Sequence, residues 1–180
     1  MKKIAIIVGS LRKQSFNRSV AKYLASMAPE GYAISFPDIG RLALYNQDLD
    51  DTPTENWVQF RDEVKAVDAL LFVTPEYNRS IPGVLKNAID VGSRPYGQSV
   101  WSGKPGGIVS VSPGDIGGFG ANHHLRQVLS CLNVYLMNHP EAYVGNIMEA
   151  LDSSGQIIAE KTPTFLTKYM NSFIRWIGRF

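Results

Sequence analysis

The sequence predicts an α/β protein built on a doubly wound parallel sheet. Short apolar runs of strand length alternate with longer segments of helical period, and this alternation is typical of βαβ units. The chain has 180 residues, of which 44% are apolar and 19% charged, as in an ordinary globular protein with a hydrophobic core. No repeat or linker interrupts the pattern, so we expect one domain over residues 1–180.

Five segments have the composition of strands in a parallel sheet. Such strands are continuously apolar rather than alternating, because helices cover both faces of the sheet. The segment at residues 32–36 is the weakest of the set. In chain order the predicted strands are residues 4–8, 32–36, 69–73, 107–111 and 134–137.

The segments between the strands carry apolar residues at spacings of three and four, which indicates amphipathic helices. We predict the start of the helix before residue 69 from Thr52, Pro53 and Glu55, which match a capping box with proline at the first helical position. Another helix begins at Pro82. The predicted buried stripes are Val20, Leu24 and Met27; Trp57, Phe60, Val64 and Val67; Leu85 and Ile89; Leu125, Val128, Leu129 and Leu132; and Phe165, Tyr169, Phe173 and Ile177.

The number of strands restricts the topology. Five strands are too few for a dinucleotide-binding fold with two complete halves, whereas the flavodoxin-like order 2-1-3-4-5, with helices on both faces, fits the length. In such sheets ligands bind outside the carboxyl ends of the strands, where the strand order reverses. We therefore expect the loops after strands one, three and four to form the functional site.

The loop after the first strand, residues 9–17, has the residue types of an anion site. It opens into a helix, whose free backbone amides and positive dipole end favour negative charge. Ser10, Ser15 and Asn17 add short donors, and Arg12 can neutralise a phosphate dianion. The alternative is that Ser15 or Asn17 only caps the helix. A P-loop and a Gly-x-Gly-x-x-Gly fingerprint are both absent, so we expect a terminal monophosphate.

Two other loops at the same edge are unusual. Residues 74–83 place an exposed-looking Tyr77 between two prolines, and a rigid turn of this kind can direct backbone amides toward a flat ring with polar edges. An ordinary loop with Pro82 at a helix start is an equal alternative. Residues 114–120 contain four glycines, which favour close backbone approach, unusual backbone angles, a tight turn or a flexible lid.

Several chemistries are disfavoured. A single cysteine excludes an internal disulfide, and Cys131 is expected to pack beside a buried stripe. His123 and His124 are adjacent and cannot both bind one metal, so we predict no metal site. The net charge of +2, without a basic block, gives no indication of nucleic acid as a partner. No apolar run reaches the roughly 18 residues of a membrane helix, and no signal peptide is present, so we expect a cytoplasmic protein.

Two motifs resemble a known family. The loop at residues 9–17, together with Pro75-Glu76-Tyr77-Asn78 and residues 80–90, is similar to the NAD(P)H-dependent FMN reductase family, whose members include bacterial quinone, azo-dye and chromate reductases. The similarity extends over nearly the whole chain, although Val91 departs from the tryptophan of many members. It implies bound FMN, NADPH or NADH as electron donor, a small-molecule acceptor, and a homodimer or homotetramer.

The resemblance also implies roles for individual residues, none of which is an obligate catalytic acid or base. Arg79 and Arg126 stay open between the 2′-phosphate of NADPH, a subunit interface and solvent. The alternative function is a flavodoxin-type electron carrier without NAD(P)H activity, which the basic charge disfavours. The implied contacts are Ser10, Arg12, Ser15, Phe16 and Asn17 for the FMN phosphate; Pro75, Glu76, Tyr77 and Asn78 for the ring; and Ser112 and Gly114 for the other ring edge.

Overall fold

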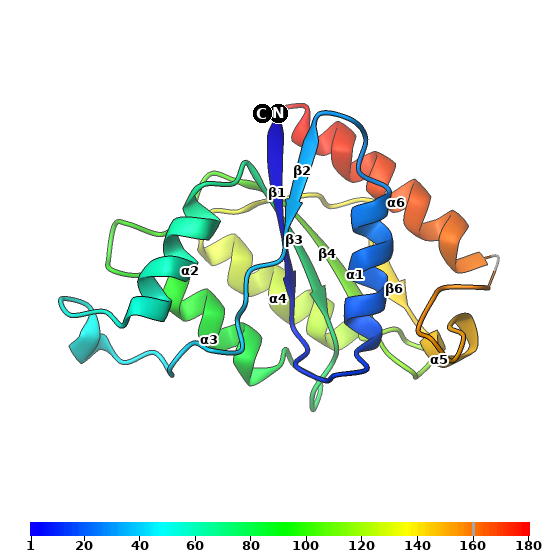
Figure 1. The fold of residues 1–180 in the computed structure, drawn as a ribbon, viewed down its shortest axis with the longest axis horizontal. Coiled ribbons are helices and arrows are strands. Elements are labelled where there is room, and N and C mark those ends of the chain that lie inside the picture. Colours follow the sequence, from blue (N-terminus) through cyan, green and yellow to red (C-terminus); the bar gives the residue numbers. More distant parts are fainter. Residues whose placement is uncertain (160) are drawn as a thin grey trace.

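The computed structural model describes residues 1–159 and 161–180 (Figure 1). Strands and helices alternate along most of the chain, as the sequence predicts. The strands are β1 (Lys2–Val8), β2 (Tyr32–Ser35), β3 (Ala69–Thr74), β4 (Pro105–Val111), β5 (Tyr135–Leu136) and β6 (Ala142–Val144). The helices are α1 (Phe16–Ser26), the 3₁₀ helix η1 (Gln47–Leu49), α2 (Glu55–Lys65), α3 (Gly83–Gly92), α4 (Phe119–Cys131), α5 (Ile147–Ala150) and α6 (Lys161–Ile177).

The strands form one parallel sheet in the order β2-β1-β3-β4-β5, which confirms the predicted topology. The edge beyond β4 differs from the prediction of a single strand at residues 134–137. Pro105 pairs with Tyr135 of β5, while Val109 pairs with Ala142 of the separate strand β6. Pro140 lies between the two short strands and has no amide hydrogen to donate to a ladder.

Alternate residues of each strand enter two different cores, because successive side chains point to opposite faces of a sheet. Ile4 and Ile6 pack with α1 and α6 on one face. Ala5 and Ile7 pack with α2, α3 and α4 on the other. Figure 1 shows α1 and α6 on one side of the sheet and α2, α3 and α4 on the opposite side. This double covering explains why the central strands are apolar throughout.

Two local predictions are wrong. The N-cap of α2 is Thr54, whose Oγ1 accepts from the amide of Trp57 at 3.4 Å, so the helix begins after Pro53 rather than at it. Cys131 is exposed at the last position of α4, because the buried side of this helix is formed by residues such as Leu125 and Leu129.

Among the described residues, no helix is long and apolar enough to cross a membrane.

Gly107 of β4 sets the distance between the sheet and α6. A Cβ at this position would lie 2.7 Å from Oη of Tyr169 and 3.0 Å from the ring of Phe173. We expect Gly107→Ala to lower the free energy of unfolding by about 1–3 kcal/mol, because the methyl group overpacks this contact. Gly83→Ala is the control, since its Cβ would meet no heavy atom within 4 Å. Urea unfolding of both variants measures the effect, and equal stability would contradict this account.

Candidate functional site

The loops after β1, β3 and β4 meet at the carboxyl edge of the sheet, where the strand order reverses. They enclose a cavity of about 240 Å³. Its walls come from the end of β4 and from all three loops that the sequence singles out. The lining residues are Ser10, Arg12, Phe16, Asn17, Pro75, Glu76, Tyr77, Val111, Ser112 and Pro113.

The loop after β1 presents unused polar groups to this cavity. Asn17 is 4% exposed, and its buried Oδ1 has no hydrogen-bond partner among the described residues. Ser10 is also buried. The guanidinium of Arg12 lies 4.7 Å from the centre of the Phe16 ring, and no ion pair joins it to a carboxylate in the described part of the chain. The loop therefore offers an unpaired cation and buried polar groups at the start of α1.

Ser15 and Asn17, each predicted either to bind an anion or to cap the helix, have different roles in the structure. Ser15 is the N-cap of α1, and its Oγ accepts from the amide of Arg18 at 3.2 Å. Asn17 makes no capping bond. No acidic side chain lies in the first turn of α1, so the positive end of the helix dipole is not neutralised there. This arrangement favours an anion in front of the helix.

The loop after β3 is a tight hairpin turn. The amide of Tyr77 donates to the carbonyl of Ser80, and the amide of Ser80 donates to the carbonyl of Tyr77, both at 2.9 Å. Asn78 and Arg79 between them have φ values of 52° and 65°, the signature of a two-residue type I′ turn. Tyr77 is 50% exposed and lies at the rim of the cavity. The turn thus fixes an aromatic side chain beside the opening.

Glu76 fastens this hairpin to α4. One carboxylate oxygen accepts from Nη1 of Arg79 at 3.0 Å, and the other accepts from the amide of Ala121 at 3.0 Å. Ala121 lies in the first turn of α4, where backbone amides have no partner within the helix. The side chain of Glu76 is therefore engaged with the protein, and its aliphatic part and backbone remain to line the cavity.

The glycine-rich loop after β4 shows the unusual backbone angles and the close backbone approach that its glycines favour. Gly117 has a φ of 59°, and a Cβ there would lie 2.7 Å from the backbone of Tyr143. The amide of Gly114 donates to Oγ of Ser112 at 3.1 Å, which closes a compact turn. The loop is therefore packed tightly against β6. Its preceding residues, Ser112 and Pro113, contact the cavity.

The side chain of Tyr143, on β6, lies next to this loop. The hydroxyl of Tyr143 lies 2.8 Å from Nε2 of His123. Burial, and then the neighbouring carboxylate of Glu141, raise the pKa of Tyr143 to about 12. The hydroxyl therefore stays protonated at neutral pH and keeps its contact with the histidine.

Most of the predicted residues are brought together, but a few lie elsewhere. Ser15 faces a neighbouring groove, while Asn78 and Gly114 shape the turns beside the cavity without lining it. Sequence reasoning missed Val111 and Pro113, although their positions at the end of a predicted strand were a usable signal.

The two ambiguous arginines have different surroundings. Arg79 is 75% exposed and pairs with Glu76, so it remains accessible at the surface. Arg126 is 15% exposed, donates from Nε to Oδ1 of Asn122 at 3.1 Å and from Nη1 to the carbonyl of Met137 at 3.3 Å. Its contacts are internal, and a solvent-facing position is therefore wrong for Arg126. The described residues contain no cluster of three or more potential metal ligands.

The strand order and the position of this cavity at the carboxyl edge are those of a flavodoxin-like fold. Residues 2–149 match the family model of NADPH-dependent FMN reductase, so the chain belongs to that family. A quinone reductase of Pseudomonas putida is 55% identical over 97% of this chain and 94% of its own length. A 2-hydroxy-1,4-benzoquinone reductase of a Burkholderia species is 49% identical over 97% and 96%.

A solved structure agrees with these relatives. FerB, a flavoenzyme NAD(P)H:(acceptor) oxidoreductase from Paracoccus denitrificans, superposes with a TM-score of 0.92. It is 40% identical, and the match covers 99% of this chain and 98% of FerB. The similarity therefore includes the complete sheet and the loops at its carboxyl edge.

The link between Glu76 and α4 gives a prediction that needs no ligand. We expect Glu76→Ala to speed hydrogen exchange of the Ala121 amide by about tenfold, because this amide loses a charged acceptor. Glu76→Gln is the control, since its side-chain oxygen still accepts a hydrogen bond, and its effect should be smaller. Exchange measured by NMR that is equal in both variants and the native protein would contradict the proposed link.

Proposed function

We propose that this chain is an NAD(P)H-dependent FMN oxidoreductase that reduces quinones, with its FMN held in the cavity at the carboxyl edge of the sheet. The observation that carries this proposal is the convergence of the three loops on one cavity with an unpaired Arg12 and a buried, unpartnered Asn17. Membership of the NADPH-dependent FMN reductase family supports it independently.

The residues present fit the phosphate of FMN. A phosphate monoester needs several donors and a compensating positive charge. Ser10, Ser15 and Asn17 offer short polar side chains at the start of α1, and Arg12 offers a free guanidinium braced by Phe16. No hydrogen bond joins Nδ2 of Asn17 to the described residues, so this nitrogen can donate to a phosphate oxygen, whereas the buried Oδ1 is an acceptor and would need a donor. The loop therefore anchors the cofactor.

The flavin ring fits the other two loops. Pro75, Glu76 and Tyr77 form one border, held by the hairpin turn at Asn78, and Ser112 forms another, held by the turn at Gly114. The chemistry that FMN supplies when bound is two-electron transfer from NADPH or NADH to an acceptor. The protein orients the reactants and provides donors at the ring edge, and no side chain has to act as an acid or base.

The acceptor class follows from the relatives. Two close relatives are named as a quinone reductase and a 2-hydroxy-1,4-benzoquinone reductase. A quinone is flat and carries carbonyl oxygens, so it can stack at the open side of the cavity beside the exposed Tyr77. Azo dyes, nitroaromatics, chromate and free flavin are further acceptors of the family. The flavodoxin-type carrier is disfavoured, because the related FerB is named as a flavoenzyme NAD(P)H:(acceptor) oxidoreductase.

The same proposal covers the state of the protein in the cell. We expect one FMN-binding domain over residues 1–180, in the cytoplasm, acting on small molecules rather than on nucleic acid or membranes. Tyr77 lines the cavity, and Ile116 and Phe119 follow the lining residues Ser112 and Pro113 in the chain; all three, here called the exposed apolar rim, are at least 50% exposed. Exposed apolar side chains of this kind favour a homodimer or a homotetramer of such dimers.

The function is tested by the oxidation of NADPH and NADH by the purified, FMN-loaded protein. We expect slow oxidation alone and fast oxidation after addition of benzoquinone, because the acceptor regenerates the oxidised cofactor. A protein that binds FMN but oxidises neither dinucleotide would support the electron carrier instead. A protein that cannot be loaded with FMN would remove the central claim.

Arg12 gives the sharpest single substitution. We expect Arg12→Ala to weaken FMN binding to the apoprotein by roughly 10–100-fold, because a charge-assisted contact to a phosphate is lost. Lys13→Ala is the matched control, since Lys13 does not line the cavity. Flavin fluorescence titration measures both. Equal affinities would exclude Arg12 from the phosphate site.

The oligomeric state is tested with Phe119→Glu, which places a charge on the exposed apolar rim. We expect the native protein to have the mass of a dimer or tetramer by light scattering, and the variant to shift toward monomer. A native monomer would overturn this part of the proposal.

A further inference from the structure

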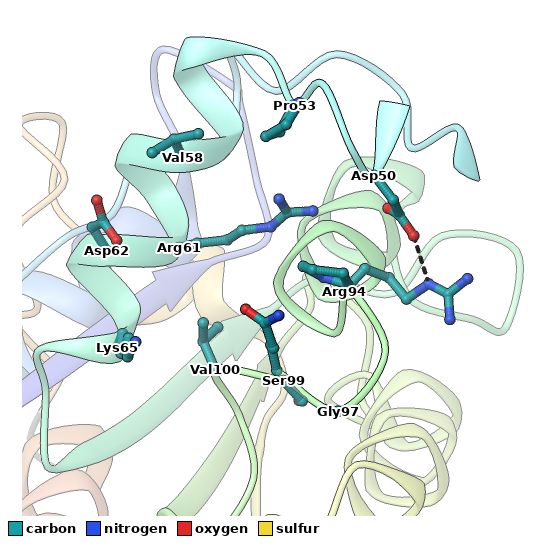
Figure 2. Close-up of a pocket in the computed structure, with 12 residues that line it drawn as sticks. Asp50, Pro53, Val58, Arg61, Asp62, Lys65, Arg94, Gly97, Ser99 and Val100 are labelled. Carbon is teal, nitrogen blue, oxygen red and sulfur yellow. Dashed lines mark ion pairs between the residues drawn. The ribbon is translucent and has the colours of Figure 1, made fainter. Parts of the chain in front are cut away.

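A second cavity lies away from the proposed flavin site, and the two have no lining residue in common. It has a volume of about 530 Å³ and lies between α2, the segment around Asp50 and residues 94–100 (Figure 2). Its walls combine apolar residues such as Val58 and Val100 with several charged side chains. The cavity is therefore an amphipathic pocket of small-molecule size.

Arg61 of α2 extends toward this cavity and is not satisfied by the protein. Figure 2 shows its side chain reaching from the helix toward the space between Pro53 and Arg94. Arg61 is 9% exposed, and its Nε donates to the carbonyl of Val91 at 2.9 Å. Neither terminal nitrogen has a hydrogen-bond partner among the described residues, and Nη2 is buried.

This guanidinium is a buried cation without a bound anion. Its Cζ lies 5.4 Å from the centre of the Trp57 ring, but no ion pair reaches it in the described part of the chain. Burial lowers the pKa of Arg61, and the negative charge of Asp50 offsets this effect only in part. A buried charge is normally paired, so a ligand that brings a negative charge would complete the site.

Asp50 provides an unused acceptor on the same cavity. Its Oδ2 accepts from the hydroxyl of Tyr45 at 3.3 Å and lies 3.5 Å from Nε of Arg94. Its Oδ1 is buried and has no partner. No ion pair joins Asp50 to Arg61, so the cavity has an unsatisfied donor and an unsatisfied acceptor on different segments.

We propose that this cavity binds a small hydroxycarboxylate with an apolar body. Its carboxylate would pair with Arg61, whose planar fork matches two carboxylate oxygens. Its hydroxyl would donate to Asp50, and its apolar part would contact Val58 and Val100. The site is separate from the flavin chemistry, and it gives the protein a second class of small-molecule ligand.

The charges favour a monoanion over a phosphate. Arg61, Lys65 and Arg94 face Asp50 and Asp62 around the cavity, which leaves one positive charge in excess. A dianion would exceed this charge and would approach both carboxylates. A neutral ligand would leave Arg61 unpaired.

The test is calorimetric titration of the FMN-loaded protein with 4-hydroxybenzoate, with benzoate and inorganic phosphate as comparisons. We expect one saturable site per chain, weaker binding of benzoate because it lacks the hydroxyl, and no binding of phosphate. Val58→Asp should weaken 4-hydroxybenzoate by about tenfold through repulsion and loss of an apolar contact, and Val58→Asn, which loses the contact without adding a charge, should weaken it less. Val58 is 40% exposed, so both variants retain the fold.

Arg61→Gln provides the direct variant, and we expect it to abolish binding. Arg12→Ala, in the flavin loop, distinguishes the two sites; titrated with enough FMN to saturate its flavin cavity, it should bind 4-hydroxybenzoate with unchanged affinity. Absence of saturable binding to the native protein would overturn the proposal, as would binding that is insensitive to Val58→Asp and Arg61→Gln. Tighter binding of phosphate than of 4-hydroxybenzoate would also overturn it. Loss of binding in Arg12→Ala alone would assign the ligand to the flavin cavity.

Discussion

The close approach of β1 and β3 at their carboxyl ends positions the whole functional edge of this protein. The amide of Gly9 donates to the carbonyl of Val73 at 2.9 Å, which continues the sheet by one residue beyond β1. A Cβ at Gly9 would lie 3.0 Å from Oγ1 of Thr74 and 3.2 Å from Leu85, so only glycine allows this contact without displacement of its neighbours. The loop after β1 and the hairpin loop after β3 consequently diverge from one point, and the cavity forms between them.

Packing and polar contacts have different roles at this edge of the sheet. The two apolar cores hold α1 and α4 rigidly on opposite faces of the sheet, and Glu76 connects the hairpin to the first turn of α4. Because α1 has no acidic residue in its first turn, its positive end remains available to an anion. The proposed flavin site therefore relies on backbone geometry and on Arg12 rather than on an acid–base side chain.

The sequence predicts the strand order, the three site loops and most of the cavity lining, because these follow from hydrophobic runs and turn residues that act locally. Long-range contacts account for the failures. Cys131 is exposed because helix rotation against the sheet, rather than spacing alone, decides which residues are buried. The bond from Glu76 to the amide of Ala121 joins positions far apart in the chain, and no local pattern indicates it.

Arg61 is a second case that local sequence patterns do not predict, because here a charged residue is buried rather than an apolar one exposed. It lies on a helix whose apolar stripe was correctly predicted, and a charged residue there would normally face solvent. The structure buries it, and its Nε donates to the carbonyl of Val91 on α3. A cation in such surroundings is recognised only when both helices are seen together.

The central claim is that the loop after β1 binds the phosphate of FMN, and it is tested most directly by comparing the affinities of the apoprotein for FMN and riboflavin. The two flavins have the same ring and differ in the phosphate alone. The account predicts that FMN binds at least roughly 100-fold more tightly, since several charge-assisted contacts depend on that group. Equal affinities would show that the loop does not recognise a phosphate and would contradict the account.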